Sequence, residues 1–164
     1  MNKIRKEGII MNYLLVSPNF PTSQENFARK LVEKGVRVLG IGSVNYDNLT
    51  DGLKNSLTEY YKVNDLENYE EVLRGVAFLI YKHGVIDRVE SNNEYWLTLD
   101  SIIREQFNIP GVKPKNLDFT KYKSKMKERF IKAEVPVAKG RAVKTIKELE
   151  KAIKDIKLPV IAKP

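Results

Sequence analysis

The sequence predicts an α/β fold with an open, mostly parallel sheet, and two features of the chain lead to that prediction. Short unbroken apolar runs, such as residues 13–16 and 36–42, are typical of strands buried on both faces of a parallel sheet. Stretches with apolar residues at helical spacing lie between these runs. Such an alternation of strands and helices is typical of open α/β sheets, and 42% of the residues are hydrophobic, which suffices for a core.

The first strand, helix and strand are the clearest elements. The strand over 13–16 is followed by Thr22 and Ser23, either of which can cap the next helix, and Gly35 ends that helix. Its apolar stripe consists of Phe27, Ala28, Leu31 and Val32. The strand over 36–42 then completes a βαβ unit.

The elements after this unit repeat the alternation. We expect a helix over 49–57, a strand over 59–63 and a helix over 68–74. The run over 76–81 is strongly apolar and predicts a further buried strand. A helix over 94–107, with a broad apolar face, follows it.

The last third of the chain begins with a predicted linker over 114–119. A helix over 120–133 follows, and a second helix begins at Thr145, with Glu148 in the capping-box position. The extended or strand segments expected around these helices are 135–137, 143 and 158–164. Together they predict a partial α+β unit.

The predicted organisation is a leader over 1–11, an α/β domain over 12–113 and the second unit over 114–164. Charge is distributed unevenly: residues 1–112 carry 13 basic and 15 acidic side chains, whereas residues 113–164 carry 16 basic and 6 acidic ones. The formal net charge of +8 therefore arises in the last third. It indicates either a surface for an anionic partner or half of a larger domain whose acidic part lies elsewhere.

Composition excludes several classes of site. The chain has no cysteine and one histidine, which excludes disulfides, thiolate metal sites and the usual zinc sites. A Gly-x-x-x-x-Gly-Lys-Ser/Thr loop, a complete Gly-x-Gly-x-x-Gly fingerprint and a nucleophile elbow are also absent from the sequence. No segment has the unbroken apolar length of a membrane helix. We therefore expect a cytoplasmic protein that does not contact a membrane.

Two lysines stand in unusual contexts. Lys123 opens a predicted helix, and Lys163 lies near the end of the apolar run over 159–164. A lysine that closes an apolar strand is hard to explain by packing, because its ammonium group resists burial without an anionic partner. Phosphate oxygens are one such partner.

From residue 122 to residue 164 the sequence resembles the opening of an ATP-grasp domain. The matching segments are Lys123, Met126-Lys127, 134–138 and 159–164. Residues 12–113 resemble the Rossmann-like pre-ATP-grasp domain that precedes it. Tyr122 and Glu134 depart from the family pattern, which more often has an acidic residue and a glycine there.

This resemblance implies an ATP-dependent ligase that activates a small carboxylate as an acyl phosphate, as in carboxylate–amine ligases, biotin carboxylase and carbamoyl-phosphate synthase. Lys123 and Lys163 would bind the phosphates of ATP, with Mg²⁺ bridging those phosphates. The family's glycine-rich loop, adenine hinge and metal-binding Glu/Asn pair would lie beyond Pro164, so no metal ligand is expected within this chain. Residues 1–164 alone are therefore expected to be inactive and to bind ATP weakly.

Loops after predicted strands offer candidate substrate contacts, because ligands of open α/β sheets bind at the carboxyl ends of strands. Ser17 and Asn19 follow the first strand. His83, Arg88 and Glu94 follow the strand expected over 76–81. Each can equally be a solvated loop residue, or, for Glu94, a carboxylate that stabilises a helix N-terminus.

Two other functions compete with the ligase. A basic nucleic-acid-binding module would use the lysines of 113–163, but that region has only two arginines and few aromatic residues, so nucleic acid is not the expected partner. A regulatory α/β module would need an acidic cluster at strand ends, which the segment after Ser17 lacks. A homodimer is also conceivable, formed through the open strand edge near Lys163 or the apolar face of the second unit.

Overall fold

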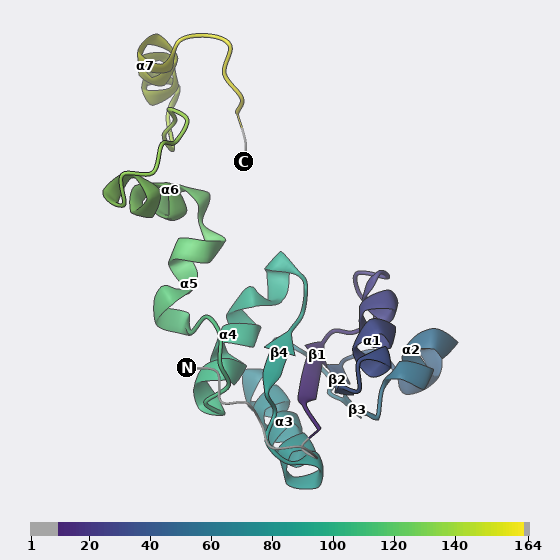
Figure 1. Cartoon of the computed structure of the whole chain (residues 1–164). Coiled ribbons are helices and arrows are strands. Elements are labelled where there is room, and N and C mark those ends of the chain that lie inside the picture. The colour runs from purple at the N-terminus through teal and green to yellow at the C-terminus, as the bar shows by residue number, and fades with distance from the viewer. Residues whose placement is uncertain (1–9, 163–164) are drawn as a thin grey trace. The chain divides into compact units, whose positions relative to one another are not determined.

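The computed structural model describes residues 10–162. The chain divides into an N-terminal unit that ends at Leu117 and a C-terminal unit that begins at Asp118. Figure 1 shows the elements of both units along the chain. The leader expected over 1–11 lies almost wholly outside the described residues.

The N-terminal unit is built on a four-stranded sheet in which all strands are parallel. Its strands are β1 (Asn12–Val16), β2 (Arg37–Gly42), β3 (Glu59–Lys62) and β4 (Arg88–Glu90). They lie in the order β3-β2-β1-β4, with Leu14 opposite Leu39 on one side and Val89 on the other. The prediction of an open parallel α/β sheet is thereby confirmed.

Helices cover both faces of this sheet (Figure 1). The helices α1 (Gln24–Glu33) and α2 (Asp51–Ser56) pack on one face, and α3 (Tyr69–His83) and α4 (Leu97–Gln106) pack on the other. Successive side chains of β1 alternate between the two cores, because side chains of a strand point to opposite faces. Leu15 lies in the core with α1 and α2, whereas Leu14 and Val16 lie in the core with α3 and α4. Two short 3₁₀ helices, η1 (Tyr46–Asn48) and η2 (Glu94–Trp96), complete the unit.

The strand predicted over 76–81 is wrong, because these residues belong to α3. Val76 and Leu79 are fully buried, whereas Phe78 and Tyr81 are 42% and 89% exposed. That alternation has the period of a helix with one buried face. The apolar residues on the outer face made the segment look continuous, and the fourth strand is instead the short β4.

Within residues 118–162, helices are the regular secondary structure of the C-terminal unit. Helix α5 (Pro114–Lys121) occupies the segment predicted as a linker and crosses the boundary between the units. The helix predicted over 120–133 is interrupted at Tyr122, whose extended backbone separates α5 from α6 (Lys123–Lys132). Helix α7 (Ile146–Ile156) begins as predicted: the Thr145 side chain accepts a hydrogen bond from the Glu148 N–H, and the Glu148 carboxylate accepts one from the Thr145 N–H.

The strands predicted in this unit do not form within the part that the structure describes. Residues 135–137, 143 and 158–162 are neither strand nor bridge. A strand needs a neighbour for its N–H and C=O groups, and no described segment of residues 118–162 supplies one. The strand edge through which a homodimer was expected is therefore missing over 158–162.

No helix among the described residues is long and apolar enough to cross a membrane.

Candidate functional site

The carboxyl edge of the sheet carries three of the five candidate substrate residues. Ser17 and Asn19 follow β1, and Glu94 follows β4, which is the parallel neighbour of β1. Ser17 is 8% exposed with a left-handed φ of 51°, and its N–H donates to the Ile41 carbonyl at 2.9 Å. This bond ties the β1–α1 loop to the end of β2 and fixes where the loop leaves the sheet.

His83 and Arg88 lie at the opposite, amino edge of the sheet. His83 is the last residue of α3, and its carbonyl accepts a 2.9 Å hydrogen bond from the side chain of Asn12, the first residue of β1. Its ring contacts the carboxylate of Glu59, the first residue of β3, and Arg88 is the first residue of β4. The expectation that His83 and Arg88 follow a strand is wrong, because it depended on a strand over 76–81.

A buried polar cluster lies beside the carboxyl end of β4, and the sequence analysis missed it. The carboxylate of Asp100, on α4, accepts hydrogen bonds from the Ser91 hydroxyl at 2.7 Å and from the Ser91 N–H at 3.1 Å. Gln24, at the start of α1, donates to the Ser91 carbonyl and accepts from Asn92 at 3.0 Å. The only signal in the sequence was an aspartate on the apolar face of a helix, next to Leu99.

Arg104 extends this cluster to the outer edge of β4. Its guanidinium pairs with the Glu90 carboxylate at 2.9 Å and donates to the Val89 carbonyl at 2.8 Å. Within residues 10–162, Asp100 Oδ1 and Arg104 Nε have no hydrogen-bond partner although both atoms are buried. The cluster therefore joins α4 and the start of α1 to the last strand of the sheet, and it holds the base of the carboxyl-edge loops.

Lys123 is placed as predicted, at the first position of α6 in the C-terminal unit. It is exposed and makes no hydrogen bond or ion pair with any described residue. The helix start lacks a side-chain cap at Tyr122 and has no acidic residue in its first turn. Because the N-terminus of a helix carries partial positive charge, lysine is unfavourable there unless an anion is near. The second lysine of the prediction, Lys163, lies outside the described residues.

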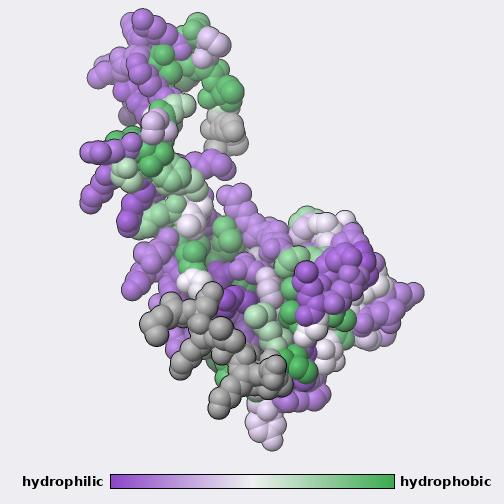
Figure 2. Space-filling view, viewed as in Figure 1, coloured by the Kyte–Doolittle hydropathy of each residue, from purple (hydrophilic) through white to green (hydrophobic). Residues whose placement is uncertain are grey.

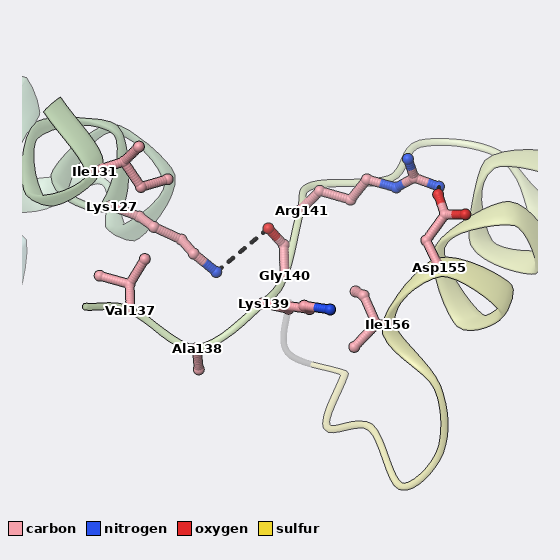
Figure 3. Close-up of a pocket in the computed structure, with 9 residues that line it drawn as sticks. All are labelled: Lys127, Ile131, Val137, Ala138, Lys139, Gly140, Arg141, Asp155 and Ile156. Atoms are coloured by element: carbon pink, nitrogen blue, oxygen red, sulfur yellow. Dashed lines mark hydrogen bonds and ion pairs between the residues drawn. The ribbon is translucent and has the colours of Figure 1, made fainter. Parts of the chain in front are cut away.

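A pocket of about 480 Å³ lies within the C-terminal unit (Figure 3). Its lining residues come from α6, from the following loop and from the end of α7: Lys127, Ile131, Val137, Ala138, Lys139, Gly140, Arg141, Asp155 and Ile156. Lys127 donates to the Gly140 carbonyl at 3.3 Å, and Arg141 pairs with Asp155 at 3.2 Å. The pocket thus combines cationic side chains with an apolar wall.

Exposed apolar side chains occur at the start of α7 and after its end. Ile146, Leu158 and Ile161 are 78%, 73% and 86% exposed, and the space-filling view shows hydrophobic side chains beside hydrophilic ones on this unit (Figure 2). The expected homodimer stays a prediction. Of the two surfaces predicted for it, the strand edge is missing over 158–162, and the exposed apolar side chains of the C-terminal unit remain.

Comparison with known proteins identifies a shared fold. No protein-family model matches the sequence, and no curated protein does so. The chain is similar in structure to an L-amino acid ligase from Bacillus licheniformis, with a TM-score of 0.54 and 14% identity. The similarity covers 89% of this chain, which spans 42% of the length of that ligase. At this identity the likeness is one of fold alone.

Proposed function

We propose that this chain forms the Rossmann-like N-terminal domain and the first part of the ATP-binding domain of an ATP-dependent carboxylate ligase. The observation that carries the proposal is the fold likeness to an L-amino acid ligase over 89% of the chain, because a match of this length reaches into both units. It agrees with the order of the sequence segments that resemble an ATP-grasp domain. Fold alone does not fix chemistry, so the proposal also depends on the residues that would bind the nucleotide.

Lys123 is the proposed phosphate contact within the described residues. Its ammonium group lies at an uncapped helix start and has no carboxylate partner there. An anion at this position would gain both the lysine charge and the N–H groups of the first turn of α6. Lys163 is proposed as a second phosphate contact on the sequence resemblance alone.

Bound ATP with Mg²⁺ would supply the phosphoryl group that activates a carboxylate for attack by an amine or another nucleophile. The lysines would offset the charge on the phosphates and hold them in place. We propose that Ser17, Asn19 and Glu94 contact the carboxylate substrate, since the loops that carry them follow neighbouring parallel strands. Residues 1–164 alone are proposed to bind ATP without turning over a ligase reaction.

Equilibrium binding tests this proposal. We expect the purified chain to bind Mg·ATP weakly, and Lys123→Ala to lower the affinity about fivefold or more, as loss of a charge-assisted contact does. Lys132→Ala is the matched control, since Lys132 lies at the other end of α6 and carries the same charge. Absence of ATP binding by the wild-type chain, or an equal effect of both substitutions, would contradict the proposal.

A further inference from the structure

The buried hydroxyl of Ser91 has one hydrogen and two acceptors within reach. Its Oγ lies 2.7 Å from Oδ2 of Asp100 and 3.2 Å from the carbonyl oxygen of Asn93. The same Oγ accepts a hydrogen bond from the Asn93 N–H at 3.3 Å. A hydroxyl has a single O–H donor and rotates to suit its partners. The bonds to Asp100 and to the Asn93 carbonyl are therefore alternatives.

While Asp100 is ionised, its carboxylate takes the hydroxyl hydrogen of Ser91. An ionised carboxylate can only accept hydrogen bonds, and a bond to a charged acceptor is stronger than one to a neutral carbonyl. Oδ2 also accepts from the Ser91 N–H at 3.1 Å. In this state the Asn93 carbonyl accepts from the Trp96 N–H at 3.2 Å, in the first hydrogen bond of η2, and receives nothing from Ser91.

A proton on Oδ2 of Asp100 reverses the direction of its bond to Ser91. The carboxyl O–H then donates to Ser91 Oγ, and the Ser91 hydroxyl turns to the Asn93 carbonyl. Oδ2 is the oxygen to protonate, because it has an acceptor at 2.7 Å, whereas Oδ1 makes no hydrogen bond with residues 10–162. Ser91 and Asp100 are both fully buried, so each protonation state has to satisfy its donors within the cluster.

The backbone around Ser91 is held in place while the hydroxyl turns. Gln24, buried at the start of α1, donates to the Ser91 carbonyl and accepts from the Asn92 side chain at 3.0 Å. The change is therefore one of hydrogen-bond direction, and it acts on Asn93. This residue caps η2, because its side chain accepts from the Tyr95 N–H at 3.0 Å.

The surroundings of Asp100 bring its ionisation close to neutral pH. Burial raises the pKa of its carboxyl from 3.8 to about 6, with hydrogen bonds and the charge of Arg104 acting against this rise and the charge of Glu90 adding to it. Tyr13, on β1, stays uncharged in this range because burial raises its pKa to about 12. From the other elements packed nearby, α1 contributes the uncharged Gln24, and α3 presents apolar side chains to the core that it shares with α4.

We infer that Asp100 and Ser91 form a protonation-dependent clasp on the start of η2: when protonated, Asp100 turns the Ser91 hydroxyl to the Asn93 carbonyl. Ser91 Oγ then bonds both the N–H and the C=O of Asn93, which tightens the turn that leads to Glu94. Asp100 and Ser91 are thus positioning residues at the carboxyl edge of the sheet. The clasp needs no ligand, and only its consequence for a substrate contact at Glu94 rests on the proposed function.

The test is an NMR titration of the chain from about pH 4.5 to about pH 8, a range that brackets the ionisation. The side-chain carboxyl carbon of Asp100 and the amides of Asn93 and Trp96 should change with one shared midpoint near pH 6. In Ser91→Ala the Asp100 carboxyl should still titrate, at a higher pH, because the hydroxyl that stabilises the carboxylate is gone. The changes at the two amides should shrink severalfold, since the link to Asn93 is lost.

Two variants control for unrelated effects. Ser101→Ala removes another buried serine hydroxyl from α4, one that donates to the Thr98 carbonyl at 2.7 Å, and should leave the titration of Asn93 and Trp96 unchanged. Histidine side chains also ionise in this pH range. His83→Gln removes the one histidine of the sequence, which lies at the opposite edge of the sheet, and should likewise have no effect on these amides.

Asp100→Asn keeps the test decisive if Ser91→Ala does not fold, because it removes the titrating group and should abolish the changes at Asn93 and Trp96. The inference is supported if these amides follow Asp100 in the wild-type chain and in both controls but not in the two clasp variants. It is overturned if they do not change together with Asp100, if they follow it equally in Ser91→Ala, or if their titration persists in Asp100→Asn. No nucleotide is present in this experiment, so the outcome is separate from that of ATP binding at Lys123.

Discussion

The hydroxyl of Ser91 donates a 2.7 Å hydrogen bond to Oδ2 of Asp100, and both residues are fully buried. The Ser91 N–H donates to the same oxygen at 3.1 Å. Burial nevertheless raises the pKa of the Asp100 carboxyl from 3.8 to about 6, because the hydrogen bonds from Ser91 and the charge of Arg104 offset the lost hydration only in part. Ser91 begins the connection from β4 to η2, so this pair fixes the segment that leads to Glu94 at the start of η2.

The raised pKa of Asp100 predicts that ionisation of this group destabilises the fold. Its carboxyl is protonated in the folded chain at pH values where it is already ionised in the unfolded chain, so the free energy of unfolding falls as pH rises from 3.8 to about 6. A shift of about two pKa units corresponds to about 3 kcal/mol. Urea unfolding across this range should show the trend as a difference between the wild-type chain and Asp100→Asn, which has no titrating group at this position. Identical pH profiles for both proteins would contradict the prediction.

The lowered pKa of Glu59, at the amino edge of the sheet, predicts the opposite pH dependence of the free energy of unfolding. Hydrogen bonding to Lys82 lowers the pKa of the Glu59 carboxyl, with a further contribution from His83. Its stabilising contribution is therefore present above the usual pKa of 4.5 and is lost as pH falls through the lower folded value. Glu59→Gln should remove this acid-side loss, and unfolding measured below pH 4.5 checks it.

Gly75 lies where α3 packs closely against the sheet. A Cβ atom at this position would lie 2.7 Å from the Tyr61 ring and 2.9 Å from Ile41 Cδ1. Gly75→Ala should therefore destabilise the chain by about 1–3 kcal/mol despite its better helix propensity. Gly52→Ala is the control: it also lies inside a helix, but the atoms nearest to its added Cβ all belong to the side chain of Glu25, which can move away. Thermal unfolding should show a loss for Gly75→Ala and none for Gly52→Ala.

The capping box of α7 predicts a local effect in the C-terminal unit. Thr145→Ala removes the side-chain oxygen that accepts from the Glu148 N–H, which costs about 1 kcal/mol of helix stability. Thr145→Ser retains the hydroxyl and should behave as the wild-type chain does. Hydrogen exchange of the α7 amides measures the change. Equal protection of these amides in Thr145→Ala and Thr145→Ser would contradict a stabilising role of the cap.

Local signals in the sequence predicted much of the fold. The apolar runs of β1 and β2 and the cap at Thr145 depend on neighbouring residues, and all three agree with the structure. The segment over 76–81 was assigned wrongly because an apolar run does not reveal whether its outer side chains, such as Tyr81, stay in water. The strand predicted over 158–164 does not form over its described residues, 158–162, for a different reason. Strand pairing depends on a neighbouring strand that the local sequence does not contain.

The site was predictable only in part. The phosphate-binding role of Lys123 stays a prediction, whereas the placement of His83 was wrong because it depended on a strand that is a helix. The contact of Ser91 with Asp100 joins two elements through tertiary packing, and no local pattern indicates it. The pocket at Lys139 likewise arises where a loop meets the ends of two helices.

The most direct test of the central claim is an amide chemical-shift titration of the chain with Mg·ATP. We predict shifts at Lys123 and along the first turns of α6. The amides of β1 to β4 should change little, since no phosphate contact is proposed in the sheet. The absence of shifts at α6, or shifts confined to the N-terminal unit, would contradict ATP binding by this chain at Lys123.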